Sequence, residues 1–116
     1  MAKYLRIPVT ILNTTSISSV AKLSEAVHWH VVGVEVPAAW TAAVLTFQSS
    51  HDGTTYQDVH TESAEYSITA LQGTNIGLNP DRLDHALFIK VRSGTSSSPV
   101  AQGADRVVQL LLRAEE

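Results

Sequence analysis

Two histidines offer the clearest chemistry in this sequence, because His28 and His30 lie two apart on a predicted strand. Side chains two apart on a strand emerge on the same face, so both imidazoles could approach one Zn²⁺ ion. Such an ion needs a further ligand, and three other histidines could supply it: His51, His60 and His85. The alternative is a polar, outward strand face beside Trp29. We favour this alternative and predict no metal and no cofactor, because no H-E-x-x-H or comparable ligand spacing is present.

Four aromatic side chains with polar edges could form a platform for sugar binding: Trp29, Trp40, Tyr56 and Tyr66. Rings of this kind stack on the apolar face of a pyranose. In the competing interpretation Trp40 fills the end of the fold beneath Pro37, and Tyr56 packs across a hairpin. Aromatic residues make up only 6% of the chain. The core needs most of them, so we favour the core role.

Catalysis is not indicated by the acidic or hydroxyl side chains. Glycoside cleavage needs two carboxyl groups on either side of a cleft. No local signature groups the candidates, which are Asp52, Asp58, Glu62, Asp81 and Asp84. A Ser–His–Asp triad lacks the G-x-S-x-G turn that would position its nucleophile. We therefore predict that the protein is not an enzyme.

Composition limits the class of protein further. The 116 residues are enough for one domain with its own core, and no cysteine is present to form a disulfide or a thiolate metal site. The net charge is −3 and the eight basic residues are scattered, so we expect no nucleic-acid partner. No apolar run is long enough for a membrane span, and the N-terminus lacks the apolar core of a signal peptide. We expect a soluble protein made in a cytoplasm.

Alternating apolar residues predict an all-β, antiparallel sandwich or barrel of about eight strands, of which we favour the sandwich. A short helix over Val20–Ala26 competes with the strand pattern there. We expect a loop over Gln72–Pro80, which is rich in Gly and Asn, and a helical turn over Asp81–Asp84. The predicted strands are Lys3–Leu12, Ser16–Ala21, Ala26–Val36, Ala43–Gln48, Thr55–His60, Glu65–Thr69, His85–Arg92 and Arg106–Arg113.

Two turns define the middle of the chain, over Val31–Asp58. Pro37 lacks the N–H that a strand ladder requires, so the preceding strand ends there. The Asp52-Gly53 pair favours a hairpin, because both residues tolerate a positive φ. Pro8 likewise indicates that residues 1–12 form an N-terminal arm or an edge strand, with residues 13–116 as a single sandwich domain. We expect the sandwich to fold without residues 1–12.

A long connection over Ser93–Asp105 is the most distinctive feature outside the expected core. Its thirteen residues exceed the usual length of a hairpin loop, and loops of this size often form interfaces. The simpler interpretation is a crossover between the two sheets, and both can hold. The start of this connection, Ser93 to Thr95, is therefore a candidate contact segment.

Several stretches together resemble a family of small structural proteins from tailed-phage and prophage gene clusters. The resemblance runs from about Ser18 to Arg113 and lies in turns and strand ends. It implies a jelly-roll-like sandwich that serves as capsid cement, head fibre or tail-associated module, with no catalytic residues. The sequence departs from the expected pattern at Val27-His28-Trp29-His30. The stretches that carry the resemblance are VGVEVPAAWTAA (32–43), LTFQ (45–48), DGTTY (52–56) and IKVRSGT (89–95) with Pro99-Val100 and Gln102.

The resemblance implies a virion protein that decorates the outer capsid surface and stabilises neighbouring major capsid subunits, as a homotrimer. The alternative is a carbohydrate- or receptor-binding module of a head fibre or tail. Neither implies nucleic acid or membrane as a partner. The residues that we expect at an interface or ligand contact are Trp29, His28, His30, Trp40, Ser93 and Thr95.

Overall fold

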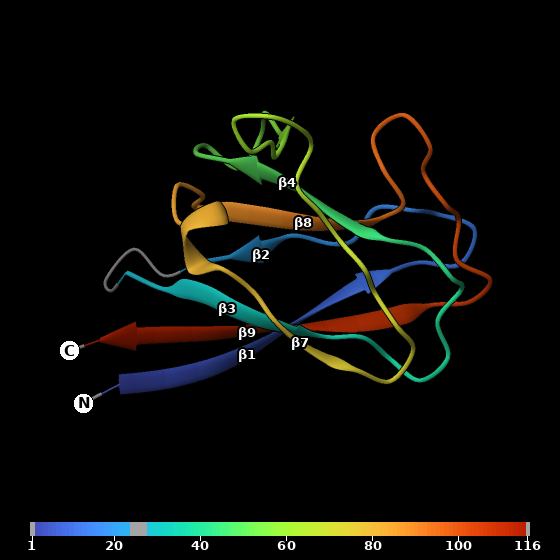
Figure 1. Cartoon of the computed structure of the whole chain (residues 1–116), viewed down its shortest axis with the longest axis horizontal. Coiled ribbons are helices and arrows are strands. Elements are labelled where there is room, and N and C mark those ends of the chain that lie inside the picture. Colours follow the sequence, from blue (N-terminus) through green and yellow to red (C-terminus); the bar gives the residue numbers. More distant parts are fainter. Residues whose placement is uncertain (1, 24–27, 116) are drawn as a thin grey trace.

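Two antiparallel β-sheets packed face to face form the fold in the computed structural model, which describes residues 2–23 and 28–115 (Figure 1). Sheet A has the strand order β1-β9-β3-β7, and sheet B has the order β2-β8-β4-β5 with β6 also paired to β4. This arrangement confirms the predicted all-β sandwich. The strands are β1 Ala2–Ile11, β2 Ala21–Lys22, β3 His30–Glu35, β4 Leu45–Ser50, β5 Gln57–Asp58, β6 Ser67–Ile68, β7 Asn75–Gly77, β8 Phe88–Ser93 and β9 Arg106–Glu115, and the 3₁₀ helix η1 spans Pro80–Arg82.

The strands pair from the two ends of the chain inwards. β1 pairs with β9, β2 with β8, β3 with β7, and β4 with the two short strands β5 and β6. Each inner pair lies in the sheet opposite to the pair outside it, so the chain crosses repeatedly between the layers. This nested order is the one found in jelly rolls.

The core lies between the two sheets and is built by residues that alternate along each strand. Val108, Leu110 and Leu112 of β9 are buried and face Phe47 and Val91 from sheet B. Intervening positions point to the outer faces, as the period of two requires. Branched and aromatic side chains of this kind fill the space without a metal or a disulfide.

Most predicted strands are present, although several are shorter than the sequence pattern indicates. The prediction of a loop over Gln72–Pro80 was wrong at its centre, because Asn75–Gly77 forms β7 against β3. In the segment Val20–Ala26, where a helix was the alternative to a strand, Ala21–Lys22 forms β2, and residues 24–26 lie outside the described residues. The predicted helical turn exists as η1, where the Asn79 side chain accepts a hydrogen bond from the Asp81 N–H.

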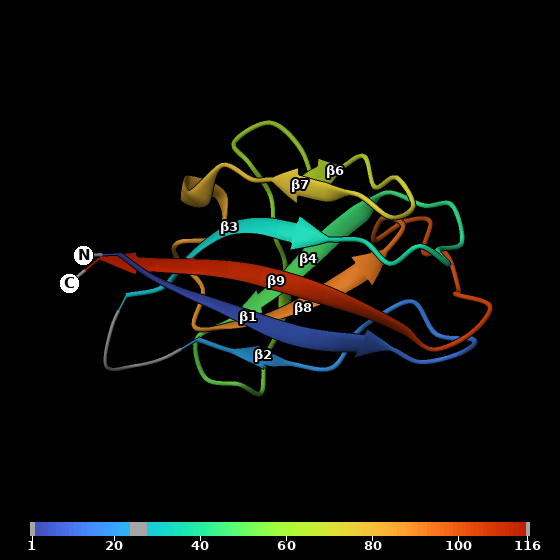
Figure 2. The same ribbon diagram turned by 90° about the horizontal axis from the view of Figure 1, so that it is seen from below.

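β1 is an edge strand that runs along β9 for ten residues, from the Ala2–Glu115 pair to the Ile11–Arg106 pair (Figure 2). Its Val9 and Ile11 are fully buried in the core. Because these side chains and the ladder belong to the sandwich, residues 2–11 are part of the domain. This changes our expectation that the sandwich folds without residues 1–12. At the end where the termini lie, β1 and β9 extend past sheet B (Figure 1).

The turn after β4 has the predicted Asp52-Gly53 hairpin. Gly53 has φ +79°, a conformation that glycine adopts without strain. The Asp52 carboxylate accepts hydrogen bonds from the Thr54 and Thr55 N–H groups at 2.8 and 2.9 Å and from Ser50 Oγ. These hydrogen bonds favour the ionised carboxylate and lower the pKa of Asp52 from 3.8 to about 2, and the bond from the Thr55 N–H contributes most to the shift.

The connection from β8 to β9 is a crossover from sheet B to sheet A, in agreement with the simpler interpretation of this segment. Gly94 begins it with φ +89°, and a Cβ atom there would lie 2.5 Å from the Ser98 carbonyl oxygen. Gln102 near its end is buried, accepts a hydrogen bond from the Thr41 N–H and donates one to the Thr41 carbonyl. The connection thereby holds the corner that follows Pro37.

Candidate functional site

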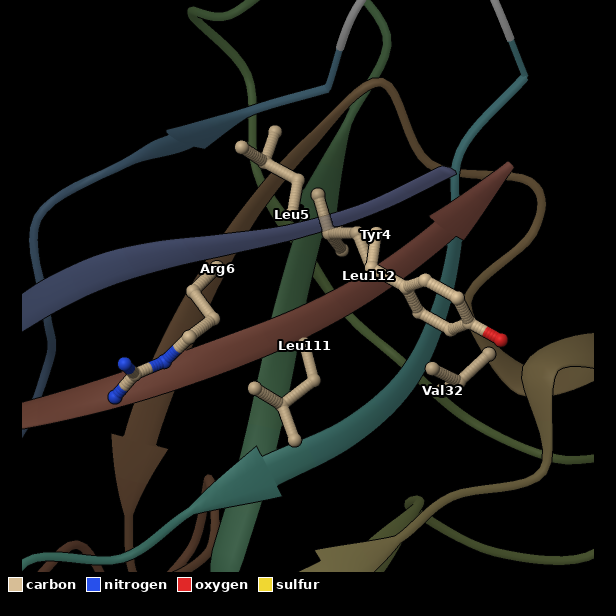
Figure 3. Close-up of a pocket in the computed structure, with 6 residues that line it drawn as sticks. All are labelled: Tyr4, Leu5, Arg6, Val32, Leu111 and Leu112. Carbon is tan, nitrogen blue, oxygen red and sulfur yellow. The ribbon is translucent and has the colours of Figure 1, made fainter. Parts of the chain in front are cut away.

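An exposed apolar surface lies on sheet A, where β1, β9 and β3 run side by side (Figure 3). Tyr4, Arg6 and Leu111 stand on its outer face, whereas Leu5 and Leu112 are a cross-strand pair on the inner face. Tyr4 is 73% exposed, and Leu5 is 44% exposed although cross-strand pairing places it beside the buried Leu112. Together they border a shallow hollow of about 490 Å³. We call this the sheet A surface, and its residues are Tyr4, Leu5, Arg6, Val32, Leu111 and Leu112.

Local backbone geometry produces this surface. The pairing register of β3 with β9 shifts between Val31 and Gly33, so Val32 is an extra residue in a β-bulge. A Cβ atom at Gly33 would lie only 3.0 Å from Leu111 Cδ1. The missing side chain at Gly33 therefore leaves space for Leu111 to lie across β3, and the bulge places Val32 beside it (Figure 3).

One ion pair borders the sheet A surface. Arg6 Nε lies 3.1 Å from Glu35 Oε1 across the outer face of the sheet, and both side chains are substantially exposed. Exposed pairs of this kind contribute little to stability. On this side the rim is polar while the hollow itself is apolar, a combination that protein interfaces also have.

The outer face of sheet B is different, because ion pairs cover it. Arg92 is buried, with Nη2 2.6 Å from Asp58 Oδ1 and Nη1 3.1 Å from Glu65 Oε2. Lys90 Nζ lies 4.3 Å from the centre of the Tyr56 ring. These charged side chains already interact with partners within the domain, so the outer face of sheet B is polar and its charges are balanced by one another.

The Arg92 network shifts the pKa of the Asp58 carboxyl group. Partial burial by itself would raise that pKa. The hydrogen bonds from Arg92 and Gln48, together with the positive charge of Arg92, outweigh the burial and lower the pKa of Asp58 below 3.8. Asp58, one of the acids considered for catalysis, therefore forms an ion pair with Arg92.

Two of the expected contact residues are corrected by the structure, because their side chains are buried. Trp40 is 2% exposed, packs in the core and donates its Nε1–H to the Ala43 carbonyl at 3.3 Å. Ser93 is fully buried, and its hydroxyl donates to the Val100 carbonyl. Neither can touch a ligand or a partner on the surface. Thr95 is half-buried, and its Oγ1 accepts a hydrogen bond from the Ser98 N–H within the turn.

The remaining aromatic candidates are not gathered into a sugar platform. Trp29 is half-buried and packs against the core, Tyr66 stacks on Phe47 with ring centres 5.6 Å apart, and Tyr56 lies under Lys90. Burial raises the pKa of the Tyr66 hydroxyl. The contacts of Trp29 and Tyr66 agree with the core interpretation, whereas Tyr56 packs under Lys90 on the outer face of sheet B and not in the core.

His28 and His30 do share a face, as predicted, and they meet Asp84. His30 Nδ1 lies 2.9 Å from Asp84 Oδ1, and His28 Nε2 lies 3.8 Å from the same oxygen. One ligand atom from each residue lies within 4.8 Å of the others. Asp84 was considered only as a catalytic acid, because 54 residues separate it from His30 and no local motif links them.

Sequence reasoning missed the sheet A surface, although one signal was present. The segment Val107–Leu112, VVQLLL, is apolar at both even and odd positions. If a strand is apolar on both faces, either both faces are packed against other parts of a protein or one apolar face is exposed to solvent. The pattern was interpreted only as a closing strand, so the outward Leu111 went unnoticed.

Comparison with known proteins gives no family for this chain. No family model matches the sequence, and a search of curated proteins found no match. No helix in the described part of the chain is long and apolar enough to cross a membrane.

Proposed function

We propose that the chain is a virion structural protein, a capsid cement or decoration protein that binds the outer capsid surface and stabilises neighbouring major capsid subunits. The sequence resemblance over residues 18–113 supports this, and the sandwich fold is compatible with it. A rigid sandwich presents a fixed surface to its partner, and capsid symmetry repeats each weak contact many times.

The sheet A surface is the observation that carries the proposal. It combines an exposed aromatic ring, aliphatic side chains and a polar rim on rigid strands, which are the features of an interface anchor. Among the described residues, Arg92, Asp58 and Glu65 on the outer face of sheet B are paired with one another, which makes that face polar. We therefore assign the sheet A surface to the contact with the major capsid protein.

The β1 edge adds a second possible contact. Thr10 and Ile11 already pair with Ser18 and Ser19, and the stretch of β1 before them can accept a further strand, as in β-augmentation. In our proposal this edge joins copies of the chain into the homotrimer. Three linked copies strengthen binding by avidity, so each individual contact can remain weak.

Particles from the phage or prophage that carries this gene provide the test. The gene is deleted, and purified protein is added back to the purified particles. We expect saturable cosedimentation, a raised temperature of capsid disruption and, in cryo-electron micrographs, density on the outer capsid surface. Density confined to the tail, or no binding at all, would contradict the proposal.

Substitutions test whether the sheet A surface makes the contact. Tyr4→Lys introduces a charge into that surface, and Leu71→Lys is the control because Leu71 is also exposed but lies elsewhere. We expect Tyr4→Lys to weaken binding at least tenfold, which corresponds to about 1.4 kcal/mol per contact. Equal binding by both variants would remove the sheet A surface from the interface. Sedimentation equilibrium of the free protein tests the trimer separately.

A further inference from the structure

The His28, His30 and Asp84 side chains bring three metal-ligating groups together at one end of the sandwich. His30 begins β3 of sheet A, and Asp84 lies in the segment between η1 and β8. His30 therefore belongs to sheet A and His28 lies two residues before it, whereas the carboxylate comes from the segment that leads into sheet B.

The backbone fixes the positions of these groups. Trp29 lies between the two histidines and packs against the core, which places His28 and His30 together on the opposite side of the strand. Leu83 is buried next to Asp84 and anchors the segment after η1. The site is thus held from both sides by apolar side chains.

Two of the three distances between the ligand atoms approach those around a tetrahedral ion, and all three atoms lie within 4.8 Å of one another. Ligand atoms at about 2.0–2.1 Å from Zn²⁺ lie about 3.3 Å from one another. The two distances to Asp84 Oδ1, 2.9 Å from His30 and 3.8 Å from His28, lie on either side of that value. His28 is 62% exposed, so its ring can turn by the small amount required, whereas the other two side chains are more covered.

We propose that His28, His30 and Asp84 bind one Zn²⁺ ion, with the fourth position open to water. Two neutral imidazoles and one carboxylate are ligands that suit zinc, and a His₂-carboxylate set with an open position is well known for it. The ion would link the start of β3 to the segment before β8 and so fasten the two sheets together. This proposal departs from our sequence prediction, which was that no metal is bound and which had considered only other histidines as a third ligand.

Zinc titration of the purified chain at pH 7.5, with a chromophoric chelator as competitor, tests the site. We expect one ion per chain. His28→Gln and Asp84→Asn should each weaken the affinity at least tenfold, because each removes one ligand. His60→Gln is the matched control, since His60 is exposed and lies outside the cluster, and it should bind as the wild type does.

Two further measurements separate a built site from loose surface binding. Co²⁺ in place of Zn²⁺ should give the intense visible absorption of tetrahedral coordination, and Zn²⁺ should raise the melting temperature of the wild type but not of His28→Gln. His28 is exposed, so its substitution should leave the fold intact. Equal zinc affinity in wild type and both ligand variants, or no binding to the wild type, would overturn the proposal.

Discussion

Arg92 allows the sharpest test of what holds sheet B together. Its guanidinium is buried and pairs with Asp58 and Glu65, which come from different segments of the chain. Arg92→Met keeps most of the side-chain volume but removes the charge. The two carboxylates are then left close together without a cation.

The expected loss follows from the burial of the network. Removing one partner of a buried ion pair costs about 3–5 kcal/mol, because the other charge stays desolvated. Asp58 retains about a third of its exposure, so water compensates part of that loss. We expect the free energy of unfolding to fall by about 2–3 kcal/mol, and the melting temperature by about 10 °C for a domain of this size.

Acid provides a second readout of the same network. The pKa of Asp58 is lower in the folded chain than its ordinary 3.8. Its contribution to stability is therefore complete above that ordinary value and is lost as the pH falls through the folded pKa. Arg92→Met removes the main cause of the lowered pKa. The variant should lose less stability than the wild type between pH 5 and pH 2.

Urea denaturation at a series of pH values measures both effects. Arg82→Met is the control, because Arg82 is exposed on η1 and should change the unfolding free energy by less than about 0.5 kcal/mol. If Arg92→Met is as stable as this control, or has the same acid slope as the wild type, the ion pairs do not stabilise the fold as we argue.

Four further predictions concern the fold. Gly94→Ala should lower the unfolding free energy by more than about 2 kcal/mol in urea denaturation, because the positive φ and the close Ser98 carbonyl both oppose a Cβ atom. Trp40→Ala should cost about 3–5 kcal/mol by the same measurement, and a near-neutral result would contradict its core role. Asp52→Asn should lower the melting temperature at pH 6 but less so at pH 2, because the lowered pKa of Asp52 contributes stability that is lost as the pH falls through about 2. Deletion of residues 2–11 should abolish the cooperative unfolding transition, and a folded truncated domain in NMR spectra would refute this.

The fold was predictable where the sequence has period-two alternation or a specific turn. These signals are present in the strands around Val34 and Phe47 and in the Asp52-Gly53 hairpin, and the structure contains both strands and the hairpin where they were predicted. β7 has no such signal. It is three residues long, and only Ile76 packs against the core, so its pairing depends on the β3 backbone beside it.

The candidate sites were harder to predict, because pairing across the sheets creates them. His28 and His30 could be placed on one face from spacing alone. Asp84 joins them only because η1 packs near the start of β3. The exposure of Leu5 likewise depends on how far sheet B extends, which no local pattern encodes.

The nested pairing has a consequence for how the protein is made. β1 is synthesised well before its partner β9, so sheet A cannot close until β9 has left the ribosome. Until then Val9 and Ile11 lack their cover, and the nascent chain exposes apolar surface. We expect folding to be slow, on the order of milliseconds to seconds, and to begin with the β4 hairpin, whose partners are near one another in sequence.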